Sequence, residues 1–158
     1  MGSRTATATK VAERSDPVEL AGRLRLSVTR LARILRHQDA GSLAPTLSAA
    51  LATVDREGPL TLGDLALREH VAPPSTTKAV DKLEAMGFVE RRQDGVDRRV
   101  SRVHITPAGH RHVMKNRVLR TAWLATRLEA LPPEDIECLA SASHILERLV
   151  EGSGGERL

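Results

Sequence analysis

Five arginine side chains cluster around one short polar turn, which spans residues 93–97. They are Arg91, Arg92, Arg98, Arg99 and Arg102. An arginine at a narrow DNA minor groove gains from the strong negative potential there, and the carboxylate of Asp97 could hold one guanidinium in a fixed rotamer. Three acidic residues accompany the five arginines. The alternative is therefore a solvated turn whose charges neutralise one another.

A second set of polar side chains falls on one side of a predicted helix over residues 73–86. With the apolar inner positions removed, the residues left are Ser75, Thr76, Thr77, Lys78, Asp81, Lys82 and Ala85. Hydroxyl groups near the start of the helix and lysines one turn later suit contacts to base edges and phosphates. The alternative is a solvated amphipathic helix with ordinary surface charge, and the pattern alone leaves both open.

Histidine is the residue type that could bind a metal, and the chain has six. His110 and His112 lie two positions apart on a predicted helix, so they point to different faces and make a poor chelating pair. Together with His37 or His144 from another helix they could still bind zinc. The alternative is that these are surface or hydrogen-bonding side chains. Zinc is therefore a candidate cofactor, although the predicted function does not require one.

Composition excludes several other functions. The chain has 158 residues, of which 41% are hydrophobic and 28% charged, as expected for about one globular domain. Phe88 and Trp123 are the only aromatic residues, which excludes base stacking by several aromatic side chains. No nucleophile–base pair, phosphate-binding loop or cluster of metal ligands stands at a useful spacing, so an enzyme is not expected. The net charge of +4 permits nucleic-acid binding without showing it.

The sequence also predicts a cytoplasmic location. Cys138 is the only cysteine, which excludes an intramolecular disulfide and fits a reducing compartment. Because it lies in an apolar stretch, we expect its thiol to be packed and inert rather than redox-active. Residues 1–15 lack the apolar region of a secretory signal, and no apolar run is long enough to span a membrane.

Capping residues and hydrophobic spacing predict six helices and one hairpin. The first helix begins at Asp16 and is stopped by Gly41, and Ser42 caps the second. The period changes to that of strands at residues 88–92 and 99–105, on either side of the turn. The remaining helices are a short one capped by Thr61 and Asp64, one over residues 73–86 with Val80, Leu83 and Met86 inside, and a long one over residues 106–130. A last helix, with apolar positions from Ile136 to Val150, precedes the polar tail that begins at Gly152.

A short helix, a tight turn and a second helix followed at once by a hairpin make a winged helix-turn-helix. The predicted fold class is therefore mainly α with a small β-hairpin wing. Such a lobe holds one helix rigidly enough to project its polar side into a DNA major groove, which is about 12 Å wide. The hairpin beside it can reach a neighbouring minor groove.

Residues 64–109 resemble the DNA-binding lobe of the MarR family of bacterial transcription regulators. The most specific parts are the wing motif Asp97-Arg98-Arg99 and the later run Ile105-Thr106-Pro107-Ala108-Gly109. The flanking helices extend the similarity over roughly residues 18–150. The resemblance implies a homodimer that binds a pseudo-palindromic operator near a promoter. It also implies a small ligand, often a phenolic acid, that weakens DNA binding.

The resemblance further implies roles for individual residues. In the major groove it places Ser75, Thr77, Lys78 and Lys82. At the minor groove it places Arg99, oriented by Asp97, with Arg98 on a phosphate. Thr76 and Arg91 complete the predicted DNA-contacting set. Two positions depart from the family pattern: Ala72 stands where a serine cap is usual, at a cost of about 1 kcal/mol, and the second helix is aliphatic at an often aromatic position.

The first helix and the last two have long apolar faces that one chain with a small lobe cannot cover. Pairing in a homodimer would cover them, and interfaces of this kind often bury more than about 2,000 Å². The alternative is a monomeric antiparallel bundle. The predicted organisation is a flexible tail over residues 1–15, a helical dimerisation region over 16–41 and 106–151, a DNA-binding lobe over 42–105 and a flexible tail over 152–158.

These expectations combine into one function, a dimeric, sequence-specific DNA-binding repressor whose affinity is tuned by a small ligand. Candidates for holding an anionic or phenolic effector are Arg23, Arg33, His37 and Arg120. Two alternatives stay open: a zinc-responsive regulator of the same fold, and a winged helix that grips a protein instead of DNA. The expected partners are double-stranded DNA, a second copy of the chain and the effector, with no membrane.

Overall fold

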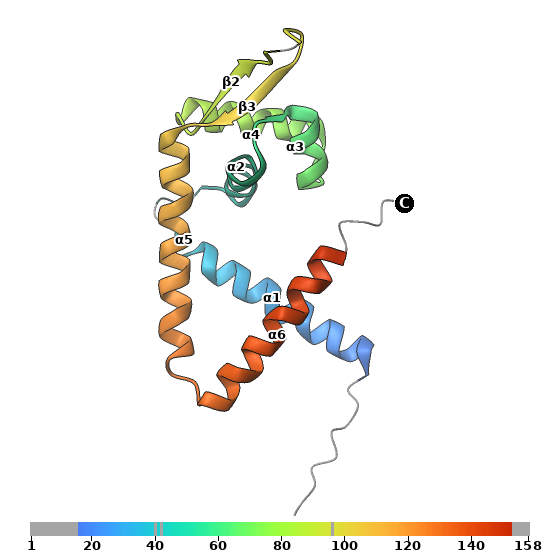
Figure 1. Cartoon of the computed structure of the whole chain (residues 1–158), viewed down its shortest axis with the longest axis vertical. Helices are drawn as coiled ribbons and strands as arrows, with labels where there is room; N and C mark the ends of the chain where they lie inside the picture. Colours follow the sequence, from blue (N-terminus) through green and yellow to red (C-terminus); the bar gives the residue numbers. More distant parts are fainter. Residues whose placement is uncertain (1–15, 40, 42, 96, 153–158) are drawn as a thin grey trace, which may run out of the picture. The chain divides into compact units, whose positions relative to one another are not determined.

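The computed structural model describes residues 16–39, 41, 43–95 and 97–152 (Figure 1). The predicted tail over residues 1–15 and all but the first residue of the tail over 152–158 lie outside this part. The chain divides into two compact units, residues 1–34 and 35–158. In chain order the elements are α1 (Pro17–Arg36), α2 (Pro45–Glu57), β1 (Leu60–Thr61), α3 (Leu62–Glu69), α4 (Pro73–Ala85), β2 (Val89–Gln93), β3 (Ser101–Ile105), α5 (Pro107–Leu128) and α6 (Pro133–Gly152).

Helix α1 begins where the sequence predicts and ends earlier. The Asp16 side chain accepts a hydrogen bond from the Val18 backbone N–H at 3.2 Å, which confirms Asp16 as the cap. The last helical residue is Arg36, and Gly41 follows after a short linker, with a φ of 79°. The prediction that Gly41 stops the helix is wrong, because a turn directly after Arg36 ends it first. No described residue of α1 is buried.

Helix α2 begins two residues later than predicted. Its N-cap is Ala44, and Pro45 occupies the first turn, where the missing N–H of proline costs no hydrogen bond. The predicted cap, Ser42, is therefore wrong, and Ser42 itself lies outside the described residues. The inner face of α2 supplies buried side chains to the core of the lobe: Leu47, Ala50, Leu51, Thr53 and Val54.

The caps of α3 and α4 differ in kind. Thr61 accepts a hydrogen bond from the Asp64 N–H at 3.0 Å and donates one to the Asp64 carboxylate at 2.8 Å, as the sequence predicts. The hydrogen bond from Thr61 holds the pKa of Asp64 below its ordinary value. Ala72 caps α4 without a side-chain hydrogen bond, and Pro73 at the first helical position favours the helical conformation of the first turn.

The wing is part of a three-stranded antiparallel sheet in the order β1-β3-β2. The hairpin pairs Val89 with Ile105 and Gln93 with Ser101, close to the predicted strands. Strand β1 was not predicted; it is two residues long and pairs Leu60 with Val103. This extra strand ties the wing to the segment between α2 and α3.

The core of the lobe is aliphatic and lies between α2, α3, α4 and the sheet. Its most completely buried large side chains are Leu51, Val54, Leu65, Val80, Leu83, Val89 and Val103. Met86, predicted to lie inside with Val80 and Leu83, is 49% exposed. That prediction is wrong because α4 ends at Ala85, so Met86 no longer follows the helical stripe.

Helix α5 starts against the base of the wing and passes α2 (Figure 1). The Thr106 hydroxyl accepts a hydrogen bond from the Gly109 N–H at 3.1 Å and donates to the Gly87 carbonyl at 2.6 Å. A Cβ at Gly109 would lie 2.1 Å from the Phe88 carbonyl oxygen, so only glycine fits there. The run Thr106-Pro107-Ala108-Gly109 is therefore the joint between wing and α5.

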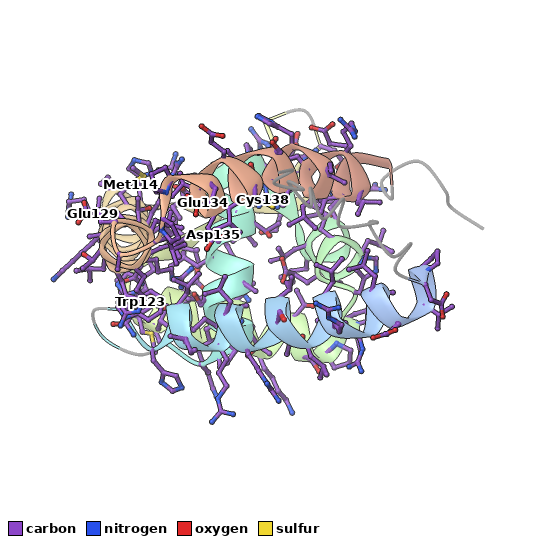
Figure 2. All side chains as sticks on the ribbon, turned by 90° about the horizontal axis from the view of Figure 1, so that it is seen from below. Met114, Trp123, Glu129, Glu134, Asp135 and Cys138 are labelled. Carbon is purple, nitrogen blue, oxygen red and sulfur yellow. The ribbon has the colours of Figure 1, made fainter. Side chains whose placement is uncertain are left out.

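Helix α6 has no described residue in the buried class, and it runs to Gly152, the first residue of the predicted tail. Cys138 lies on α6 and is exposed, so the predicted packing of its thiol within the chain is wrong (Figure 2). Among the helices of the described residues, none combines the length and apolar character that a membrane crossing needs. The predicted fold class, mainly α with a small wing, is confirmed.

Candidate nucleic-acid interface

Helix α4 presents a continuous polar face. Ser75, Lys78 and Lys82 are exposed, and Thr77 is half-buried with its hydroxyl donating to the Pro73 carbonyl at 3.1 Å. Lys78 and Lys82 lie one turn apart, and neither forms an ion pair with any residue that the structure describes. Four of the predicted groove-contacting residues therefore share one helix, with both ammonium groups available to phosphates or bases.

Thr76 does not belong to this face. Its side chain is 4% exposed, and its hydroxyl finds no hydrogen-bond partner among the described residues. Thr76, Val80 and Leu83 recur at helical spacing and form the buried stripe of α4. The predicted DNA contact by Thr76 is wrong because the same periodicity that buries Val80 also buries Thr76.

The tip of the wing is shaped by Asp97 acting on the backbone. The Asp97 carboxylate accepts a hydrogen bond from the Arg99 N–H at 2.9 Å, and its carbonyl accepts one from the Val100 N–H at 2.9 Å. The expectation that Asp97 orients the Arg99 guanidinium directly is therefore corrected: it fixes the turn from which the side chain projects. Arg98 and Arg99 are both exposed, and within the described residues no ion pair holds either guanidinium.

Arg91 is bound inside the lobe. Its guanidinium forms ion pairs with Asp81, at 2.5 Å, and with Glu84, both on α4. Its backbone N–H donates to Glu84 at 3.1 Å, and its side chain is only 26% exposed. Burial lowers the pKa of Arg91, but hydrogen bonds and charges from Asp81 and Glu84 outweigh it and raise the pKa overall.

Two further wing arginines are also paired. Arg102 bonds to Asp94, which raises the pKa of Arg102, and Arg92 pairs with Glu90 at 2.5 Å. Three of the five arginines thus neutralise acids, whereas Arg98 and Arg99 have no ion pair among the described residues. In this structure Arg91 joins strand β2 to α4 through its two ion pairs, and its contact with DNA stays a prediction.

The candidate effector residues are divided between the two compact units of the chain. Arg120 is held by Asp39 at 2.6 Å, which gives it a partner that the sequence did not predict. Arg23 and Arg33 are exposed on α1 in the other unit, and His37 is exposed in the linker after α1.

The candidate zinc ligands have separate surroundings. His110 bonds to Asp55 at 2.7 Å, His112 stacks on Phe88 with ring centroids 4.7 Å apart, and His144 lies 3.4 Å from Glu147. The described part of the chain contains no group of three or more His, Cys, Asp or Glu side chains placed to hold a metal ion. The structure therefore gives the zinc hypothesis no support.

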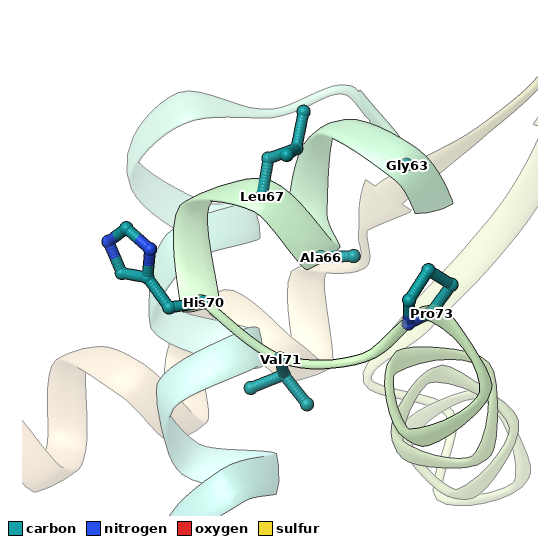
Figure 3. Close-up of a pocket in the computed structure, with 6 residues that line it drawn as sticks. All are labelled: Gly63, Ala66, Leu67, His70, Val71 and Pro73. Carbon is teal, nitrogen blue, oxygen red and sulfur yellow. The ribbon is translucent and has the colours of Figure 1, made fainter. Parts of the chain in front are cut away.

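One open apolar pocket, with a volume of about 460 Å³, lies at the turn between α3 and α4 (Figure 3). Its lining residues are Gly63, Ala66, Leu67, His70, Val71 and Pro73. None of these residues was predicted to form a binding site. The feature of the sequence that could have indicated the pocket is Leu67, an apolar residue on the outer side of a short helix. Its side chain is 74% exposed.

Comparison with known proteins decides the family. Residues 43–101 match the family model described as MarR family. An uncharacterized HTH-type transcriptional regulator of Mycobacterium bovis, Mb0904, is 38% identical over 135 residues, covering 85% of this chain and 94% of that protein. The chain belongs to the MarR family. It is therefore a DNA-binding transcriptional regulator, as the wing motif predicted.

Solved structures of MarR-like proteins share the fold. A MarR family protein from Bacillus stearothermophilus aligns with a TM-score of 0.73 at 27% identity, covering 85% of this chain and 94% of that one. Streptococcus pneumoniae FabT, solved in complex with DNA, aligns with a TM-score of 0.67 at 18% identity, covering 87% and 99%. The second likeness concerns the fold alone.

Proposed function

We propose that this MarR-family chain acts as a homodimeric repressor that binds a pseudo-palindromic operator in the cytoplasm. A dimer bound across a promoter would exclude RNA polymerase, and a small anionic or phenolic effector would weaken its DNA binding. The observation that carries the proposal is the pairing pattern of the charges. Internal ion pairs hold Arg91, Arg92 and Arg102, whereas Lys78, Lys82, Arg98 and Arg99 are unpaired among the described residues.

These four cations suit the two parts of one DNA-binding surface. Lysines on an exposed helix face can reach base edges and phosphates in the major groove. Arginines at the end of a hairpin can enter a narrow minor groove, where the negative potential is enhanced. FabT, which shares this fold, has been solved with DNA, and a similar docking is proposed here.

The dimer is supported by apolar side chains that a single chain leaves exposed. On α1, Val18 is 78% exposed and Val28 is 51% exposed, and on α6, Leu149 is 60% and Val150 is 75% exposed. Exposed apolar surface of this extent on a soluble protein marks an interaction surface. A second copy is the partner that symmetry supplies most simply, and it would place two α4 helices about 34 Å apart.

Binding of the effector is proposed separately from recognition of the operator. Arg23, Arg33, His37 and Arg120 are candidates for an anionic ligand, although Arg120 would first have to leave Asp39. Differential affinity for the DNA-bound and free states is the only way such a ligand could shift binding. Titration of the DNA complex with benzoate, using neutral benzamide as control, tests this part independently of operator recognition.

The DNA claim is tested with a duplex selected from a random-sequence pool by the wild-type protein. Arg99→Ala should weaken binding by about 1–3 kcal/mol in fluorescence anisotropy, the usual loss for a specific contact. Arg92→Ala is the matched control, because Arg92 lies on the same wing but is already paired with Glu90. Equal affinities for wild type and Arg99→Ala would remove the wing from the interface.

Salt dependence separates phosphate binding from other recognition. Each phosphate contact contributes roughly one unit to the slope of log K against log salt concentration. We therefore expect a steep loss of affinity with salt for the wild-type protein. A flat response would contradict binding through the four unpaired cations.

A further inference from the structure

The linker between α1 and α2 is tied to the middle of α5 by one ion pair. The Asp39 carboxylate accepts two hydrogen bonds from Arg120, from Nε and from Nη2, both at 2.6 Å. Arg120 Nη2 also donates to the Ser48 hydroxyl on α2 at 3.5 Å. A single guanidinium therefore holds the linker and α2 against α5.

This pair is more buried than the other ion pairs of the described residues. The Asp39 side chain is 4% exposed, the lowest value among the paired carboxylates, and that of Arg120 is 33% exposed. A buried carboxylate is costly unless it is paired and hydrogen-bonded, and the two-pronged geometry supplies both. The linker therefore has a strong physical reason to stay on α5.

The position of the pair in the chain gives it a special role. Asp39 follows the end of α1 by three residues, and the boundary between the two units falls between Ile34 and Leu35. A second tie, from His110 to Asp55 at 2.7 Å, joins α5 to α2 ten residues before Arg120. At a rise of about 1.5 Å per residue, the two ties are roughly 15 Å apart along α5.

We propose that Arg120 and Asp39 are positioning residues for operator binding. By fixing the linker to α5, they determine where α1 departs from the unit that carries the DNA-reading lobe. In a dimer joined through the outer helices, this departure point helps to set the distance between the two α4 helices. The inference rests on the proposed homodimer, and neither residue is assigned a contact with DNA.

The test compares binding to two DNA duplexes, one with both half-sites and one with a single half-site. The full palindrome, selected by wild-type protein, requires both lobes at the correct spacing, whereas a single half-site requires only one intact lobe. We expect Arg120→Gln to weaken binding to the full palindrome at least tenfold and to leave half-site affinity within twofold. Arg117→Gln is the control, because Arg117 is exposed on the same helix and has no ion pair among the described residues.

Two further variants keep the test decisive. Arg120→Lys retains a positive charge beside the buried carboxylate but loses the two-pronged bond, so it serves if Arg120→Gln unfolds. Asp39→Asn should reproduce the loss on the palindrome. The double variant Asp39→Asn with Arg120→Gln should lose no more than either single variant, since both act through the same contact.

Changing the spacing between the two half-sites tests independently whether Arg120 helps to fix the distance between the two lobes. Inserting one base pair between them should penalise wild type more than Arg120→Lys, because a loosened linker accommodates a wider range of spacings. Parallel losses on palindrome and half-site would overturn the inference, and so would unchanged affinity for both. Failure of the wild-type protein to select any duplex, or a monomeric wild-type protein, would instead overturn the proposed function on which the inference rests.

Discussion

Two adjacent threonines of α4 have opposite surroundings, and this leads to a prediction about stability. The buried Thr76 hydroxyl has no hydrogen-bond partner in the part of the chain that the structure describes, whereas Thr77 donates to the Pro73 carbonyl. Because valine has nearly the same shape without the polar atom, Thr76→Val should raise the free energy of unfolding by about 1 kcal/mol. In thermal denaturation this corresponds to about 2–4 °C. Thr77→Val is the control and should change stability by less than about 0.5 kcal/mol. Destabilisation by Thr76→Val would reveal a partner for the hydroxyl, such as a buried water.

The two roles considered for Arg91, a clamp within the lobe and a DNA contact, predict opposite changes in operator affinity. If Arg91 clamps β2 to α4, neutralising its partners with Asp81→Asn and Glu84→Gln should weaken operator binding about tenfold, because the wing loses its fixed angle. If Arg91 contacted DNA, the same changes would free its charge, reduce repulsion of phosphates and strengthen binding. Anisotropy titrations of the double variant therefore distinguish the two.

The salt dependence provides the control for the Arg91 prediction. Arg91→Gln should lower affinity without changing the slope of log K against log salt concentration. Lys82→Gln, which removes an unpaired cation from the α4 face, should reduce that slope by about one unit. A reduced slope for Arg91→Gln would return Arg91 to the set of DNA-contacting residues.

Among the elements, the joint between wing and α5 tolerates the least change. An alanine Cβ at Gly109 would lie 2.1 Å from the Phe88 carbonyl oxygen, so strand and helix must move apart. Gly109→Ala should therefore lower the free energy of unfolding by about 1–3 kcal/mol, as overpacking usually does. Gly63→Ala is the matched control in α3, since its nearest neighbour is the Thr61 hydroxyl at 3.8 Å. Denaturant unfolding measures both, and equal stabilities would show that the joint can relax.

The sequence could predict those elements whose signals are local. Helix starts at Asp16, Thr61 and Thr106 were predictable because each capping side chain accepts a hydrogen bond from a backbone N–H no more than three residues later. Strand β1 was not, because two residues become a strand only by pairing with β3. The same holds for the site: the exposed lysines follow from helical period, whereas the partners of Arg91 depend on the approach of α4 to β2.

At the scale of the whole molecule, a single chain buries the apolar core of its lobe but leaves apolar side chains of α1 and α6 exposed. The buried core consists of residues from α2, α3, α4 and the sheet, with no described member from α1 or α6. A winged lobe of this kind has the internal packing to fold, whereas amphipathic helices gain most of their stability from packing an apolar face. The proposed dimer would supply that packing and so link folding of the outer helices to association.

The dimer can be tested by placing the same charge at two exposed leucines. Leu139 on α6 is 47% exposed, and Leu67 on α3 is 74% exposed. Leu139→Glu should convert a particle of twice the 17.2 kDa chain mass into a single chain in sedimentation equilibrium, because two glutamates would enter a symmetric apolar interface. Leu67→Glu should leave the mass unchanged, since Leu67 belongs to the lobe. The melting temperature of the wild type should also rise with protein concentration, as association requires. A wild-type protein that sediments as one chain at all concentrations would contradict the dimer, and a loss of dimer in Leu67→Glu instead of Leu139→Glu would move the interface to the lobe.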